Sequence, residues 1–187
     1  GSQVAKILAE RMGVWCYDRD ILTIAAERIG NEELTEDTIN DLNYKRNDVA
    51  SAGITGVMGM GNIPIYNQMF LEQAKIIRKL ANYGSAVFLG RCADYILKDI
   101  KNCTSVYLYA DREFRKNRVK EIYGSNAEIM DKEEKNRADY YNYYTGNRWG
   151  DINNYDFAIN TSKVSFEEAA DLIYRFAKDK QKNLKDR

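Results

Sequence analysis

Arginines are the residues whose type and position best suit chemistry in this sequence, because several directly follow predicted strands. Arg91 lies one glycine beyond an apolar run, and Arg112, Arg115 and Arg118 follow the next apolar run at intervals of three. That spacing places the latter three along one stripe of a helix. Planar guanidinium groups bind phosphate oxygens in pairs and offset the charge of a phosphoryl group in transfer. These positions therefore indicate a phosphate site.

A structural role is the alternative for each arginine, since helical arginines are often solvated or paired with glutamates. We favour this role for Arg112, which has Glu113 and Glu121 as candidate partners. For Arg91 and Arg115 we favour phosphate binding, because strand-end position and helical phase direct both side chains toward the same place.

Single aspartates give weaker evidence for a binding site than the arginines do. Asp18 directly follows the apolar run 14–17, where a carboxylate could accept hydrogen bonds from a sugar hydroxyl or a base amine. A helix N-cap would also explain it. For Asp139, Asp151 and Asp156, which lack partners at metal-ligand spacing, we expect caps or turns.

Two other segments have patterns associated with nucleotides or nucleic acids. The glycine-rich stretch 53–61 lacks the Lys-Ser/Thr of a P-loop and has no convincing strand before it, so we expect its glycines to provide flexibility. A tyrosine cluster with a nearby tryptophan could stack nucleobases. Helical spacing makes side-chain packing at least as good an explanation for this cluster, which comprises Tyr140, Tyr141, Tyr143, Tyr144 and Trp149.

Composition narrows the function classes further. The 187 residues include 28 Lys+Arg and 28 Asp+Glu, and this zero formal charge argues against a nucleic-acid or anionic-membrane partner. The absence of histidine excludes Ser-His-Asp and Cys-His catalysis and histidine zinc sites. Three widely spaced cysteines indicate a reducing compartment, and there is neither a signal peptide nor a run of ~18 apolar residues. We therefore expect a cytoplasmic protein.

Short apolar strands alternate with longer helices along the chain. We expect strands over 14–17, 86–89, 105–110 and 157–160. We expect helices over 4–12, 18–29, 66–82, 93–99, 111–123, 131–145 and 165–180, followed by a frayed lysine-rich tail. This alternation predicts an α/β fold with one central parallel sheet, buried on both faces by helices. Ligands of such sheets bind beyond the carboxyl ends of the strands.

Residue patterns mark one face or one end of two of these helices. Gln73 shares the apolar face of the helix over 66–82 with Met69, Ile76 and Ile77. The pair Ser165 and Glu168 has the spacing of a capping box, which predicts where the last helix begins.

Taken together, segments along nearly the whole chain resemble the bacterial cytidylate kinase-like proteins, with 31–64 the least similar region. The resemblance rests on residues 17–22, 89–97, 109–118, 137–141 and 149–162. Its most specific parts are Gly90-Arg91-Cys92-Ala93-Asp94-Tyr95 and Trp149-Gly150-Asp151. More distantly, the order of elements is similar to that of P-loop nucleoside monophosphate kinases.

The resemblance implies a three-layer αβα P-loop kinase-like fold with a central parallel sheet. It implies a single domain over 1–187, with a mobile substrate-binding region at about 31–64 and a lid at about 125–150. Gly1 and Ser2 would be the tail of a phosphate loop whose front, with the first strand, is missing from the chain shown; an expression scar is the alternative.

The resemblance also implies ATP-dependent, Mg²⁺-assisted phosphoryl transfer to a CMP-like or dCMP-like acceptor. The acceptor would be bound by Asp18 at its nucleoside, by Arg91 at its phosphate, and by Asp94. The phosphates in transfer would meet Arg115, Arg118 and the lid residue Arg137. ATP would be bound by Gly1, by Ser2, whose hydroxyl would also contact Mg²⁺, and by Asn160 near the base.

Departures from the family pattern keep other functions open. Gly1 stands where the classical phosphate loop has lysine, and Cys92 stands where cytidylate kinases have aspartate. One alternative is a catalytically weak nucleotide-binding regulatory protein of the same fold, and another is a kinase for a different small phosphorylated acceptor. The expected partners are small-molecule nucleotides, and the sequence leaves a homo-oligomer open.

Overall fold

The computed structural model describes residues 1–18, 21, 65–124 and 127–185. The chain begins with α1 (Ser2–Met12), which ends as predicted at Gly13 in the left-handed conformation, with φ 65°. Most of the predicted helix 18–29 and the whole region 31–64 lie outside the described residues, so the proposed capping role of Asp18 is not addressed.

All four predicted strands are present, and they pair in parallel. The strand β1 (Trp15–Tyr17) pairs with β2 (Ala86–Phe88), and β3 (Val106–Tyr109) pairs with β4 (Phe157–Asn160). The structure corrects the single central sheet: among the described residues, the strands form two separate pairs. A cavity of about 1950 Å³ is lined by every residue of β2 and β3.

The remaining helices follow the prediction closely, with differences at their ends. They are α5 (Ile65–Tyr83), α6 (Ala93–Ile96), α7 (Arg112–Tyr123), α8 (Ala127–Thr145), the 3₁₀ turn η1 (Ile152–Asn154) and α9 (Phe166–Lys185). The predicted tail is helical through Lys185 rather than frayed, with lysines in the last turn where the helix dipole favours positive charge. The capping box is confirmed, because Ser165 N donates to Glu168 Oε2 at 2.8 Å and Glu168 N donates to Ser165 Oγ at 3.1 Å.

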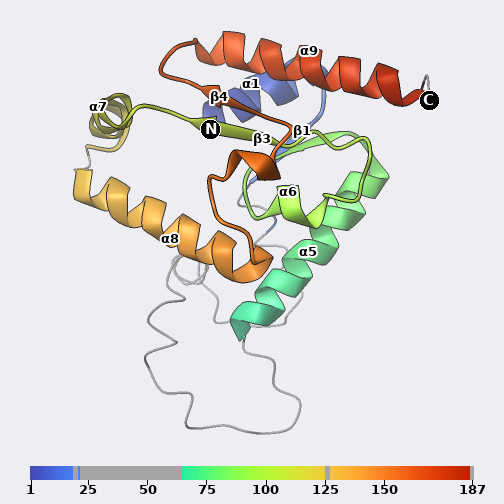
Figure 1. Cartoon of the computed structure of the whole chain (residues 1–187), viewed down its shortest axis with the longest axis horizontal. Helices are drawn as coiled ribbons and strands as arrows, with labels where there is room; N and C mark the ends of the chain where they lie inside the picture. The colour runs from blue at the N-terminus through green and yellow to red at the C-terminus, as the bar shows by residue number, and fades with distance from the viewer. Residues whose placement is uncertain (19–20, 22–64, 125–126, 186–187) are drawn as a thin grey trace, which may run out of the picture.

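Two apolar cores lie on opposite faces of the strands. On one face, Val87, Leu108 and Phe157 pack with α1 and α9, whose small residues Ala169 and Ala170 are fully buried. On the other face, Tyr17 and Phe88 pack with α5 and α6. Alternate residues of a strand point to opposite faces, so one apolar run supplies both cores. Figure 1 shows α1 and α9 on one side of the strands and α5 and α6 on the other.

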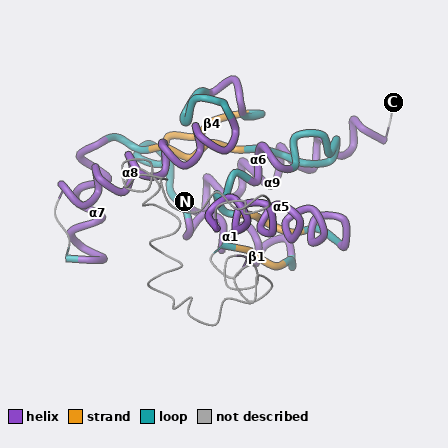
Figure 2. Tube along the Cα trace, turned by 90° about the horizontal axis from the view of Figure 1, so that it is seen from below, coloured by secondary structure: helices purple, strands orange, loops and turns teal. Residues whose placement is uncertain are grey.

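The first strand is less buried than predicted. Trp15 is 76% exposed, because no helix of the described residues packs over its ring. Figure 2 shows that α7 and α8 lie together at one end of the molecule, while α9 extends beyond the other end. In the part of the chain that the structure describes, no helix is long and apolar enough to cross a membrane.

Candidate phosphate-binding site

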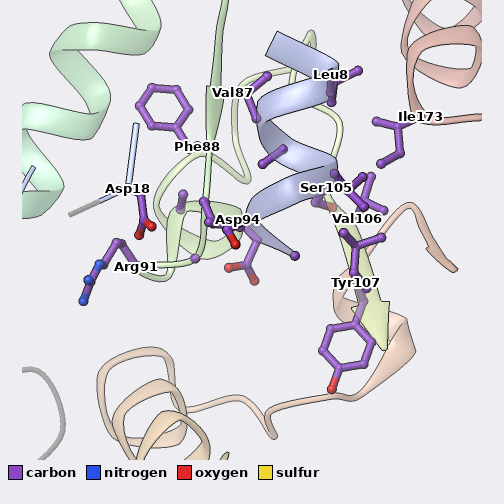
Figure 3. A pocket seen from close by; sticks show the side chains of 18 of the residues that line it. Leu8, Asp18, Val87, Phe88, Arg91, Asp94, Ser105, Val106, Tyr107 and Ile173 are labelled. Atoms are coloured by element: carbon purple, nitrogen blue, oxygen red, sulfur yellow. The ribbon is translucent and has the colours of Figure 1, made fainter. Parts of the chain in front are cut away.

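Asp18 and Arg91 lie side by side at the carboxyl ends of β1 and β2. Leu89 N donates to Tyr17 O at 2.9 Å, which continues the ladder to the point where both side chains emerge. Both residues are half-buried and line the cavity. Figure 3 shows the Asp18 carboxylate beside the Arg91 side chain. The strand-end argument named each of these two residues as a candidate, and the structure places them side by side.

The backbone around Arg91 has an unusual conformation. Gly90, Arg91 and Cys92 have φ values of 67°, 58° and 55°, so three consecutive residues occupy the left-handed region. This is costly for the two that are not glycine, and such residues cluster at functional sites. The turn leads directly into α6, which begins at Ala93.

The N-terminus of α1 opens onto the same cavity. Gly1 lies beside the end of β2, since a Cβ built on it would be 3.6 Å from Leu89 Cδ1. Desolvation and the nearby guanidinium groups of Arg137 and Arg118 lower the pKa of the Gly1 amino group. Two cationic side chains thus join the positive end of the helix dipole, which is a combination that attracts anions. The exposed Ser2 adds a hydroxyl at this point.

Arg118 and Arg137 are held to different degrees. Arg118 donates to Gln3 Oε1, and its guanidinium lies 4.5 Å from the centre of the Phe166 ring, so it is fixed between α1 and the start of α9. Arg137 is 57% exposed and has Glu133 at 4.0 Å as an ion-pair partner on its own helix. Such exposed pairs contribute little, so the Arg137 side chain can move toward an anion.

Arg115, by contrast, already has a carboxylate partner. Its Nη1 donates to Glu134 on α8, and its Nε donates to the Ala110 carbonyl at 3.1 Å. Arg112 donates to Asp131 at 2.5 Å in a second ion pair between the same helices. The ion-pair interpretation of Arg112 is right in kind, but its partner belongs to another helix. Glu134 therefore offsets part of the positive charge that Arg115 would offer to a phosphate.

Asp94 contributes a half-buried carboxylate to the cavity. Burial raises its pKa, and hydrogen bonds from Tyr141 and backbone N–H groups partly oppose that rise. The Tyr141 hydroxyl donates to Asp94 at 2.6 Å. Figure 3 shows the Asp94 carboxylate near the N-terminal end of α1.

The helical tyrosines pack as the spacing argument expected: Tyr140 and Tyr144 have ring centres 4.8 Å apart.

Asn160 has local partners on both sides of its amide. Its Nδ2 donates to Asp111 Oδ1 at 3.1 Å, and its Oδ1 accepts from Ser162 N at 2.9 Å. The bond to Asp111 joins the ends of β3 and β4, and together with Lys163 it lowers the pKa of Asp111. In this structure Asn160 therefore organises the loop at the strand ends.

The donor set suits a nucleotide better than a metal ion alone. Among the described residues, no three His, Cys, Asp or Glu side chains gather as a metal cluster. Mg²⁺ in phosphate-handling proteins uses one or two protein oxygens together with phosphate oxygens and water. The cavity-lining Ser2 hydroxyl and Asp94 carboxylate satisfy that requirement.

Two residues at this site were not identified from the sequence. Glu134 was missed because nothing in the sequence specifies how α7 lies against α8. Gln73 was noted only as a polar residue on an apolar face, although a buried amide needs hydrogen-bond partners and that was the available signal.

Parallel strand pairs covered by helices define an α/β protein, and arginines and a helix N-terminus line one cavity. The chain belongs to the cytidylate kinase-like family, which matches residues 1–163. It is similar to the crystal structure of an uncharacterized protein from Eubacterium ventriosum, with 29% sequence identity and a TM-score of 0.71. That similarity covers 96% of this chain and 92% of the other. No curated protein matches the chain. Family membership points to a nucleotide kinase.

Proposed function

We propose that this protein transfers a phosphoryl group from ATP to a nucleoside monophosphate, with CMP or dCMP as the acceptor. The observation that carries the proposal is the convergence of two separate phosphate-type sites on one cavity. Arg91 stands at the end of β2, and the N-terminus of α1 stands beside it with Arg118 and Arg137 nearby. A donor and an acceptor phosphate need such neighbouring sites.

In this mechanism the acceptor lies at the carboxyl ends of β1 and β2. Arg91 binds its phosphate through the guanidinium fork, and the Asp18 carboxylate accepts hydrogen bonds from its nucleoside. Asp94, which faces the cavity beside Tyr141, is a further polar contact for the substrate. The acceptor is thereby oriented toward the N-terminus of α1.

The donor phosphates lie at the N-terminus of α1. Backbone N–H groups after Gly1 and the hydroxyl of Ser2 bind them, and Arg118 and Arg137 offset the charge that moves between donor and acceptor. When bound, ATP supplies the phosphoryl group and Mg²⁺ neutralises part of its charge. Phosphoryl transfer requires little covalent chemistry from the protein, so the absence of histidine is no obstacle. A P-loop kinase-like fold is the architecture that we infer for this arrangement.

The direct test is release of ADP by the full chain with ATP and Mg²⁺ in the presence of CMP, dCMP or UMP. We expect turnover with at least one of these acceptors. The variant Arg91→Ala should raise the acceptor KM by about tenfold or more, because losing one charged phosphate contact removes roughly 1.5–3 kcal/mol. An unchanged acceptor KM would refute the assignment of Arg91, and no ADP release above background with any acceptor would refute the kinase.

A nucleotide-binding regulatory protein is the second candidate. The pairing of Arg115 with Glu134 favours it, because this arginine is already neutralised. Retained ATP binding without ADP release, measured by calorimetry on the same preparation, would support this function in place of phosphoryl transfer.

A further inference from the structure

Gln73 of α5 contacts both the turn after β2 and the helix α8. It is fully buried, with 0% of the residue exposed. Its Nε2 lies 3.4 Å from the carbonyl oxygen of Arg91 and 3.2 Å from the hydroxyl of Tyr140 on α8. One side-chain amide thus bridges the turn after β2 and a neighbouring helix.

The turn that Gln73 contacts needs external support. Arg91 and Cys92 both have left-handed backbone conformations, which persist only where the surrounding structure fixes them. Within the turn, the Ala93 N–H donates to the Gly90 carbonyl at 3.0 Å. The Gln73 amide donates to the Arg91 carbonyl, and this bond fixes the backbone from which the Arg91 side chain extends.

The other end of the Gln73 amide shows that packing alone does not explain this residue. Its Oε1 is buried and has no hydrogen-bond partner among the described residues. A buried unpaired oxygen is unfavourable, whereas methionine of similar size would fit the surrounding Met69, Ile76 and Ile77 without that penalty. The donating nitrogen is therefore the part of the side chain with a specific use.

We propose that Gln73 is a positioning residue that holds Arg91 ready to bind a substrate phosphate. The inference rests on the proposed phosphate-binding role of Arg91. Through Tyr140, the same amide ties the turn to α8, the helix that carries Arg137 three residues earlier. Gln73 thus fixes the acceptor arginine relative to the helix that supplies a second arginine.

The test is a double-mutant cycle on the full chain with Gln73→Met, Arg91→Ala and both together. Gln73→Met should raise the acceptor KM about tenfold while kcat changes by less than about twofold, because ground-state positioning is lost. In the Arg91→Ala background, the same substitution should have no further effect on KM. An unchanged KM, or a KM increase that persists without Arg91, would overturn the proposal.

A second pair of variants keeps the test valid if Gln73→Met does not fold. Tyr140→Phe removes one partner of Gln73 and should raise the acceptor KM by a few fold. Its matched control is Tyr144→Phe on the same helix. The Tyr144 hydroxyl instead donates to Asn67 Oδ1 at 3.3 Å. Equal KM values for the two variants would contradict a role through Gln73.

Hydrogen exchange separates failure of this inference from failure of the proposed function. If the wild-type protein releases no ADP, the kinase proposal fails, yet the turn can still be examined. Gln73→Met should speed exchange of the Ala93 amide by about tenfold, because the turn opens more often. An unchanged exchange rate would overturn the positioning role whatever the enzyme assay shows.

Discussion

The surroundings of the Asp94 carboxyl group make the stability of the fold depend on pH. This carboxyl group is partly withdrawn from water, and among the described residues it accepts a hydrogen bond from the hydroxyl of Tyr141 at 2.6 Å. A neutral hydroxyl compensates a carboxylate less than a cation would, so burial dominates and the pKa rises. The ionised form of Asp94 therefore costs folding stability.

The raised pKa of Asp94 predicts that the stability of the protein depends on pH. Because the folded-state pKa of Asp94 lies above the ordinary value of 3.8, the native protein binds more protons than the unfolded chain. The contribution of Asp94 to stability is therefore full below the unfolded pKa and is lost as pH rises through the folded pKa. Asp94→Asn should be more stable than wild type at pH 7 and show a flatter dependence over the acid range.

Urea unfolding at a series of pH values measures this effect. Asp99→Asn, which changes an exposed aspartate nearby, is the matched control and should follow the wild-type curve. A lower stability of Asp94→Asn at neutral pH would show that the ionised carboxylate is stabilising in the fold, contrary to this argument.

Residues were predictable where chain position alone decides their surroundings. Asp18 and Arg91 follow strands that pair, so strand ends sufficed to place them together. Arg115 was not predictable in the same way, because its partner Glu134 depends on the packing of two helices rather than on the position of either one. The same limit applies to Tyr140, whose contact with Gln73 crosses elements far apart in sequence.

At the scale of elements, the segment after α8 has a clear structural role. Trp149 N donates to Asn142 Oδ1 at 2.6 Å, and the Trp149 ring meets Tyr107 of β3 edge-on with centres 5.8 Å apart. Gly150 has φ 77°, and a Cβ added there would lie 3.1 Å from Tyr107 Oη. Asp151 then caps the 3₁₀ turn by accepting from Asn153 N at 3.0 Å. The Trp-Gly-Asp sequence therefore fixes the end of α8 against β3.

Gly150→Ala should destabilise the protein by about 1–3 kcal/mol, because the added methyl group both strains a left-handed backbone and displaces the Tyr107 hydroxyl. Thermal unfolding should show a Tm lower by about 2–4 °C for each kcal/mol. Gly84→Ala is the control, since nothing lies within 4 Å of a Cβ there. Equal Tm values for the two variants would contradict the close approach described for Tyr107.

Helix ends were predictable where a local signal marks them. Gly13 and the Ser165–Glu168 capping box act through their own neighbours, and both end or begin helices as expected. The helix predicted over 93–99 begins at Ala93 as expected but ends at Ile96, where the chain continues through turns. Backbone strain at Arg91 and Cys92 leaves no trace in residue type.

At the scale of the whole molecule, the two strand pairs and their two cores meet around one cavity. β2 lines it from one side and β3 from the other, while α1 contributes its N-terminus. The alternation of strands and helices predicted a parallel arrangement, but pairing partners of strands are decided by long-range packing. Parallel pairing is therefore confirmed, whereas the described strands form two hydrogen-bonded pairs rather than one continuous sheet.

A ligand that bridges this cavity should stabilise the entire fold. At a ligand concentration of 100 times Kd, binding contributes about 2.7 kcal/mol, which corresponds to a Tm increase of about 5–10 °C for a chain of this size. We expect such increases with ATP and Mg²⁺ and with CMP, measured separately by thermal unfolding. Arg91→Ala should diminish the increase with CMP while leaving that with ATP. No increase with either nucleotide would contradict a nucleotide site in the cavity.

Because the two tryptophans lie in different environments, intrinsic tryptophan fluorescence can report ligand binding in the cavity. Trp15 is largely in solvent, whereas Trp149 lines the cavity and contacts Tyr107. Because the chain has only these two, replacing Trp15 with phenylalanine would leave one indole whose emission responds to the cavity. Rapid mixing could then follow the arrival of each nucleotide in real time, without an added dye and without turnover.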